Sequence, residues 1–228
     1  MVVPVLRLFF GVEPALAAAD SLFFVFANTL AASVTFMQRR VVDFSRGLTI
    51  AGAGIPSSIL GAYVVRLLSG RDFDLIYGVF LITTAILIVL RRNKQPEPRN
   101  LRPRQKLMLE IFIGLAVGFA SSLFGIGGGI VLVPALLVLF REDAHATAAT
   151  SAFVVMLTSP AGIIAHGLYG DLQAWAAFPL VAGGFAGGTV GAQVARRLHA
   201  VHLSTVMAGM LFAAALALAV KHVHMGHA

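Results

Sequence analysis

The stretch "SSLFGIGGGIVLVPAL" at residues 121–136 places four glycines within five positions of an otherwise apolar segment. Each glycine in a helix interior is less favourable than alanine by about 1 kcal/mol. A cluster of glycines therefore breaks a helix and leaves backbone amides without intrahelical partners. What such a break does depends on whether the segment lies in water or in a membrane.

The composition is that of a membrane protein. Of the 228 residues, 58% are hydrophobic and 12% are charged, whereas a soluble domain carries about 25% charged residues. Apolar runs long enough to cross a bilayer recur without the alternation of β-strands. They cover residues 15–37, 47–65, 75–90, 107–124, 146–165, 174–195 and 203–220. The sequence predicts an all-α polytopic transmembrane helical bundle, surrounded by lipid in the cell (inner) membrane.

A basic loop divides the chain. Seven of the 17 Lys and Arg residues fall in "RRNKQPEPRNLRPRQK" at residues 91–106. Cytoplasmic loops of membrane proteins are enriched in these residues, so the cluster predicts that this loop is cytoplasmic. The net charge of +7 therefore does not lead us to expect a nucleic-acid partner. We expect a first transmembrane repeat at 1–92, a cytoplasmic loop at 93–106, and a second repeat with a short tail at 107–228.

The two halves match without a gap when shifted by 130 residues. Matching positions include Val3-Pro4 with Val133-Pro134, Ser21 with Ser151, Gly54 with Gly184, Gly61-Ala62 with Gly191-Ala192, and Arg66 with Arg196. The pattern predicts an internal duplication into two homologous repeats, which is common among transporters. The first half lacks a counterpart of residues 107–129, so we expect the functional protein to begin roughly 25 or more residues upstream.

Three segments resemble the sulfite exporter TauE/SafE family. They are "GIGGGIVLVPALL" at 125–137, "ATAATSAFVVMLTS" at 146–159 and "HGLYGDLQAW" at 166–175. The resemblance covers nearly the whole chain and implies two four-helix repeats, each opening with a glycine-rich segment. It also implies secondary transport of small sulfur-containing anions such as sulfite, sulfonates and sulfoacids. The alternative is a non-transporting membrane subunit or a truncated, inactive paralogue.

The glycine cluster is the first candidate site. In hydrocarbon, the broken backbone around Gly125, Gly127, Gly128 and Gly129 must line a cavity or be buried in protein. Unpaired amides at the start of the segment that follows would attract an anion, although glycines also serve close helix packing. That segment, residues 130–140 with Pro134, is too short to cross a bilayer and predicts a re-entrant or broken helix. Its copy at 2–10 should do the same.

Polar side chains in the following helix are the next candidates. Their hydroxyl and amide groups would donate to an anion, or would bond to neighbouring helices instead. They are Thr150 and Ser151, Ser21 at the matching place in the first half, and the equivalent pair Asn28 and Thr158.

Burying a carboxylate such as Asp20 among apolar residues is energetically unfavourable, so Asp20 is a candidate carrier of a coupling proton. The alternative is a helix-end charge near the lipid headgroups. His166 lies near the end of its predicted helix, where a histidine is expected to be solvated.

No catalytic or cofactor motif accompanies these features. The chain has no HExxH, no GxSxG and no phosphate-loop lysine, so we expect neither an enzyme nor a cofactor. His222, His224 and His227 lack an acidic or thiol partner, so no metal site is expected. A homo-oligomer remains compatible with the sequence. The direction of the second half also stays open, because it depends on whether the short segment 130–140 counts as a crossing.

Overall fold

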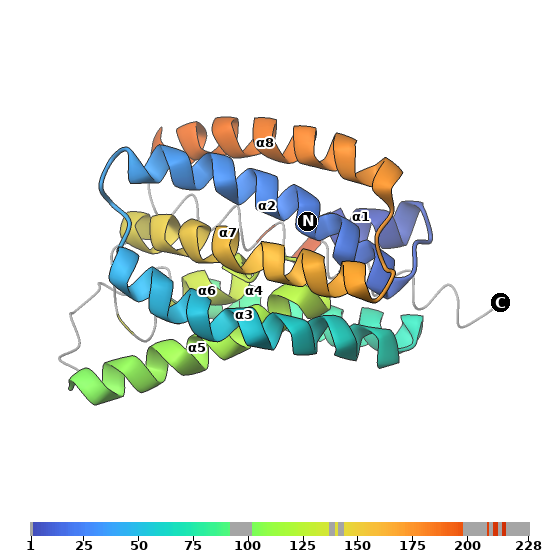
Figure 1. Ribbon diagram of the computed structural model, residues 1–228, viewed down its shortest axis with the longest axis horizontal. Coiled ribbons are helices and arrows are strands. Elements are labelled where there is room, and N and C mark those ends of the chain that lie inside the picture. The colour runs from blue at the N-terminus through green and yellow to red at the C-terminus, as the bar shows by residue number, and fades with distance from the viewer. Residues whose placement is uncertain are drawn as a thin grey trace.

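The computed structural model describes residues 2–91, 102–136, 140 and 144–197, and the single positions 209, 212, 213, 216 and 217. All regular secondary structure in these residues is helical (Figure 1). The helices are α1 (Val2–Phe9), α2 (Pro14–Met37), α3 (Phe44–Leu67), α4 (Gly70–Arg91), α5 (Pro103–Phe124), α6 (Gly129–Ala135), α7 (Ala144–Leu168) and α8 (Ala174–Arg197). The all-α prediction is confirmed.

Four of these helices, α2, α3, α5 and α7, are long and apolar enough to cross a membrane. Each predicted run up to residue 195 falls inside one helix, and α1 and α6 are short, as expected. The predicted run 203–220 lies outside the described residues, apart from a few single positions.

Local signals explain where the long helices begin. Pro14 and Pro103 occupy the first positions of α2 and α5, where a missing N–H is tolerated. α3 begins after Asp43, whose side chain accepts a hydrogen bond from the Arg46 amide at 3.1 Å. α5 ends at Gly125, which has a positive φ of 62°.

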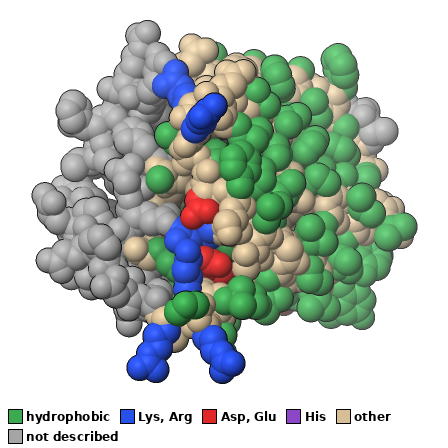
Figure 2. Space-filling model, turned by 60° about the vertical axis from the view of Figure 1, so that its left-hand side comes forward, with side chains coloured by type: hydrophobic (Ala, Val, Ile, Leu, Met, Phe, Trp, Pro, Cys, Tyr) green, Lys and Arg blue, Asp and Glu red, His purple; other side chains and the backbone are tan. Residues whose placement is uncertain are grey.

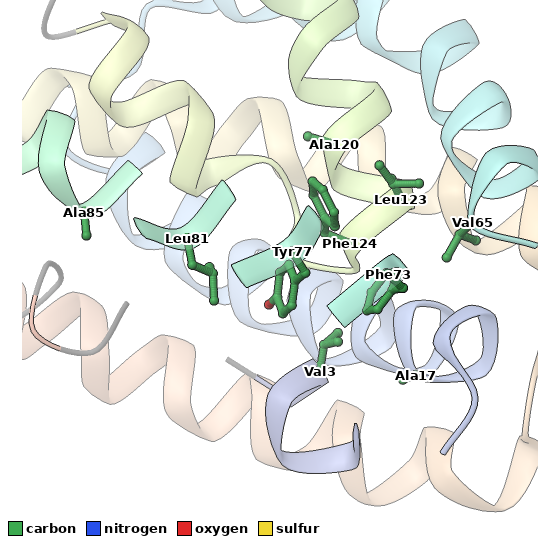
Figure 3. Packing of buried hydrophobic residues seen from close by; sticks show 10 residues of the cluster. All are labelled: Val3, Ala17, Val65, Phe73, Tyr77, Leu81, Ala85, Ala120, Leu123 and Phe124. Carbon is green, nitrogen blue, oxygen red and sulfur yellow. The ribbon is translucent and has the colours of Figure 1, made fainter. Parts of the chain in front are cut away.

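Five long helices form a row in the order α8, α2, α7, α3 and α5 (Figure 1), and consecutive members of this row contact each other. α4 and α6 lie behind the row in this view. A buried cluster that includes Val3 of α1, Phe73 and Tyr77 of α4 and Phe124 of α5 joins the short helix to the bundle (Figure 3).

A buried ion pair fixes α1 to α4. Arg7 donates from Nε to Asp74 Oδ1 at 2.9 Å and from Nη2 to Asp74 Oδ2 at 2.6 Å. Arg7 also donates to the carbonyls of Val12 and Gly70. A two-pronged pair of this kind fixes geometry as well as charge, so the short helix has a defined position despite its length.

Corresponding helices of the two halves run in opposite directions. In Figure 1, α2 runs toward the end where α3 begins, whereas α7 runs toward the opposite end, where α8 begins. The bounds of α3 and α8, 44–67 and 174–197, are 130 residues apart. These bounds agree with the predicted duplication, which stays a prediction. Of the two directions that the sequence left open, the structure has the inverted one.

The inverted direction gathers basic residues at one end of the molecule. The C-terminal end of α8, at Arg197, lies at the same end as the C-terminal end of α2 and the start of α5 (Figure 1). Arg39 and Arg40 follow α2 directly in the sequence. Figure 2 shows charged side chains collected in one part of the visible face, with hydrophobic side chains over most of the remaining described surface. The positive-inside tendency predicts that this end is cytoplasmic.

Cysteine labelling tests this topology, because the chain has no native cysteine. In intact cells, Arg197→Cys should be protected from a membrane-impermeant maleimide and should react only after permeabilisation. Arg71→Cys, at the opposite end, should react in intact cells. Labelling of Arg197→Cys without permeabilisation would contradict the inverted arrangement.

Candidate functional site

Residues 125–128 form the glycine loop that joins α5 to α6. Gly127 and Gly128 have φ values of 74° and 63°, in the left-handed region that glycine adopts without strain. A Cβ at Gly128 would lie 2.5 Å from Val117 Cγ1 and 2.9 Å from the Val117 carbonyl oxygen. Both the conformation and the space therefore require glycine here.

The glycine loop is enclosed by α2, α5 and α7. A Cβ at Gly125 would meet the backbone of Ala18 in α2, and Gly127 lies between Val25 of α2 and Val155 of α7. Ser21 donates a hydrogen bond from Oγ to the Gly125 carbonyl at 2.6 Å. The broken backbone is thus buried in protein, as the sequence argument requires.

Backbone donors in the glycine loop are left unsatisfied. Among the described residues, the amides of Ile126, Gly127 and Gly128 have no hydrogen-bond acceptor, whereas the Gly129 amide donates to the Gly127 carbonyl at 2.7 Å. A buried donor without a partner is destabilising by about 1–3 kcal/mol. Successive amides in turn conformations form concavities that bind anions. Because α6 has only seven residues, a candidate anion site here would depend on these loop amides and not on the dipole of a long helix.

Hydroxyl groups border the same loop. Ser121 has a buried side-chain oxygen without a hydrogen-bond partner in the part of the chain that the structure describes. The Ser121 Cβ lies 3.5 Å from the position that a Cβ on Gly128 would take, and Ser151 Oγ lies 3.6 Å from that position on Gly129. Donors from α5 and α7 therefore adjoin the glycine loop.

The structure separates the polar residues singled out by sequence. Ser21 and Ser151 adjoin the glycine loop, and Pro134 is buried within α6. Thr150 Oγ1 instead accepts a hydrogen bond from the Asp43 amide at 3.2 Å, which ties α7 to the start of α3.

Thr158 and Asn28 lie at helix contacts. Thr158 Oγ1 donates to the Val155 carbonyl of its own helix at 3.4 Å, and its methyl group adjoins Gly54 of α3. The backbone of Asn28 lies against Gly188 of α8. Their predicted part in anion binding stays a prediction.

Asp20 is buried, with 1% of its surface exposed. Its Oδ1 accepts a hydrogen bond from the amide of Gln173, the residue before α8, at 3.3 Å. Asp20 also lines a cavity of about 550 Å³ between α1, α2 and α8, whose other lining residues are mostly apolar. Its side chain is therefore enclosed by protein near the start of α2, and its predicted role stays a prediction.

The expectation that His166 is solvated is wrong, because its side chain is fully buried. The chain turns at Gly170 and brings Asp171 back over the ring, with Nδ1 3.5 Å from Asp171 Oδ2. Nε2 lies 3.1 Å from the Ser122 carbonyl. Arg66 Nε is 3.8 Å from the same Asp171 oxygen. Both ring nitrogens thus face acceptors, and His166 connects the helix turn before the glycine loop to a polar end of the bundle.

Ser121 and Ser122 were missed at the sequence level, and so was the burial of His166. A serine pair directly before a glycine cluster, inside an apolar helix, was the available signal for the first two. The spacing of His166 and Asp171 around a glycine turn was the signal for the third. No group of three or more His, Cys, Asp or Glu side chains that could hold a metal occurs among the described residues. The histidines at 222, 224 and 227 lie outside them.

Spanning helices that enclose a broken, glycine-rich backbone with buried polar donors define a multi-pass membrane protein of the transporter class. The chain belongs to the sulfite exporter TauE/SafE family, whose model matches residues 1–218.

Curated relatives carry transporter names. The probable membrane transporter protein YunE of Bacillus subtilis is 29% identical over 218 residues, which cover 89% of this chain and 80% of that protein. A probable membrane transporter protein of Methanocaldococcus jannaschii is 30% identical over 73% of this chain and 63% of its own length. One of Xylella fastidiosa (strain Temecula1) is 27% identical over 91% of this chain and 81% of its own length. No solved structure matches the chain.

Alanine substitutions test the geometry of the glycine loop. Gly128→Ala should lower the free energy of unfolding by at least about 1–2 kcal/mol, since the left-handed conformation alone is that unfavourable for a side chain. Gly129→Ala should not be destabilising, because a Cβ there would lie 3.6 Å from Ser151 Oγ, an ordinary contact. Unfolding of the purified protein in detergent measures both. Equal losses in the two variants would contradict the left-handed conformation of Gly128.

Proposed function

We propose that this protein transports small sulfur-containing anions, such as sulfite, sulfonates or sulfoacids, across the cell membrane as a secondary transporter. The observation that carries the proposal is the set of amides of Ile126, Gly127 and Gly128, which have no hydrogen-bond acceptor among the described residues. Gly127 and Gly128 are buried. The chemical class of the substrate comes from the family description. The names of the relatives support transport without specifying what is carried.

The chemistry of the glycine loop suits an oxyanion. Sulfite and sulfonate groups each carry three oxygen atoms that accept hydrogen bonds from several directions. The backbone amides, with Ser121 and Ser151 beside the loop, supply neutral donors. Neutral donors hold an anion without the full charge of a lysine or arginine, so a transported ion is released more readily.

A serine variant tests this donor set. Because the Ser121 hydroxyl has no partner in the described residues, Ser121→Ala should leave the stability of the ligand-free protein nearly unchanged. A ligand that binds only the folded state raises its apparent stability. Sulfite or a sulfonate should therefore raise the melting temperature of the parent, and this rise should shrink in Ser121→Ala.

Ser57→Ala is the matched control, since the Ser57 hydroxyl bonds to the Gly54 carbonyl within α3. It should keep the anion-dependent rise in melting temperature. A choline salt should give no rise in any variant. Substitutions at Gly128 cannot replace this test, because they strain the loop itself. If no anion shifts the parent, or Ser121→Ala keeps the whole shift, the proposed site is wrong.

Asp20 is the proposed carrier of a coupling proton. It is a buried carboxylate beside a cavity of about 550 Å³, and carboxylates within spanning helices commonly serve proton relays. Its hydrogen bond from Gln173 gives it a second role, because it holds the start of α8.

Asp20→Asn separates these two roles. The amide oxygen of asparagine can still accept the Gln173 hydrogen bond, so the fold should persist, while proton exchange at this position is lost. In proteoliposomes loaded with sulfite, the dependence of flux on an imposed pH gradient should disappear. The exposed Asp72 provides Asp72→Asn as the control. Unchanged flux and pH dependence in Asp20→Asn would reduce Asp20 to an anchor for α8.

A further inference from the structure

A fully buried histidine lies beside the C-terminal end of α5. His166 of α7 has 0% of its surface exposed, and its Nε2 lies 3.1 Å from the Ser122 carbonyl oxygen. A carbonyl oxygen only accepts hydrogen bonds, so Nε2 must carry a hydrogen. In a continuous helix this carbonyl would accept the amide of Ile126. That amide makes no such bond among the described residues, and the ring of His166 takes its place.

The other ring nitrogen of His166 faces a carboxylate. Nδ1 lies 3.5 Å from Asp171 Oδ2. The backbone fixes this contact, because the Asp171 amide donates to the His166 carbonyl at 3.0 Å and Gly170 turns the chain with a φ of 81°. When Nε2 carries the hydrogen of a neutral ring, Nδ1 is an acceptor. Two acceptors then face each other, and one added proton on Nδ1 makes the contact a charge-assisted hydrogen bond.

Two features favour a positive charge on this ring. A negative charge within about 4–6 Å favours the charged form of a histidine, and Asp171 supplies it. A cation near the C-terminal end of a helix also interacts favourably with the last carbonyls, and Ser122 lies in the last turn of α5. Burial acts in the opposite direction, because a charge is unfavourable away from water. A histidine subject to both kinds of effect is suited to binding a proton and releasing it again.

The pair of His166 and Asp171 opens toward one end of the bundle. The Asp171 side chain is 13% exposed and that of Arg66 in α3 is 42% exposed, and Arg66 Nε lies 3.8 Å from Asp171 Oδ2. Arg66 Cζ also lies 5.2 Å from the centre of the Tyr169 ring, which contacts the Tyr63 ring. Among the described residues, Asp171 and Arg66 are the charged groups that face His166. α3 and α7 end here, opposite the start of α5 (Figure 1), so Asp171 gives the buried ring its access to solvent.

We propose that His166 and Asp171 form a proton-binding site attached to the glycine loop. The proton enters past Asp171 and binds at Nδ1, and the resulting imidazolium donates to Asp171 on one side and to the Ser122 carbonyl on the other. Because Ser122 lies three residues before Gly125, the charge of the ring acts on the start of the glycine loop. A link to a transported anion rests on the proposed function, whereas proton binding itself does not.

Nitrogen NMR of the histidine rings tests proton binding without any anion. In a parent labelled with nitrogen-15 histidine, the ring signals that are missing from His166→Gln belong to His166. They should change from the neutral to the charged form as the pH falls from about 8 to about 5. In Asp171→Asn the midpoint should move to lower pH by about one unit or more, because the amide supplies no negative charge. Asp72→Asn, at an exposed carboxylate, should leave the midpoint unchanged.

Glutamine can still donate to the Ser122 carbonyl, so His166→Gln should fold. If it does not, the shift of one ring signal in Asp171→Asn identifies His166 instead. A ring that stays neutral over this pH range would make His166 a structural cap of α5 and would overturn the proposal. A midpoint that Asp171→Asn leaves in place would overturn it as well, because the carboxylate would then have no part in the site.

Methanesulfonate separates this proposal from the proposed function, because it stays charged over the whole pH range. An anion bound at the glycine loop favours the charged ring. The midpoint of His166 should therefore move to higher pH by about 0.7 unit or more, the shift that a fivefold coupling produces, and the shift should shrink in Ser121→Ala. A His166 titration that depends on Asp171 but that no anion shifts would contradict the proposed anion site and support the proton-binding site alone.

Discussion

The rest of the structure depends on the need to bury a broken backbone inside a membrane. Hydrocarbon offers no hydrogen bonds, so the glycine loop must be enclosed by protein. Small residues allow this, because Ala18 of α2 lies directly against Gly125. Ser21 satisfies the Gly125 carbonyl, whereas the amides of Gly127 and Gly128 have no acceptor among the described residues. The proposed anion site uses these amides as its donors.

Much of the fold could be predicted from the sequence because hydropathy alone determines which segments lie in the membrane. The predicted runs 15–37 and 174–195 fall within α2 and α8. The direction of the second half could not be predicted, because hydropathy does not say whether a short segment such as 130–140 returns the chain across the bilayer. The inverted direction also brings Arg197 to the end that holds Arg39 and Arg40, which charge counting alone had left unresolved.

The candidate site was only partly predictable. The glycines were found because four of them in an apolar run destabilise a helix, so their presence calls for another explanation. Ser121 was missed because only the folded structure shows that this residue of α5 lies next to the glycine loop. His166 was misplaced for a related reason. Proximity to a helix end suggested contact with water, but the side chain is fully buried, and Asp171 Oδ2 lies 3.5 Å from its Nδ1.

Asp20 shows how the two halves differ in chemistry while sharing one geometry. At the matching position, Thr150 accepts a backbone amide with a neutral hydroxyl. Asp20 accepts the equivalent amide with a carboxylate, and burial of a charge is far less favourable than burial of a hydroxyl. A hydroxyl would suffice to hold α8, so the anchoring role alone gives no reason for a carboxylate. The proposed proton-binding role does give one.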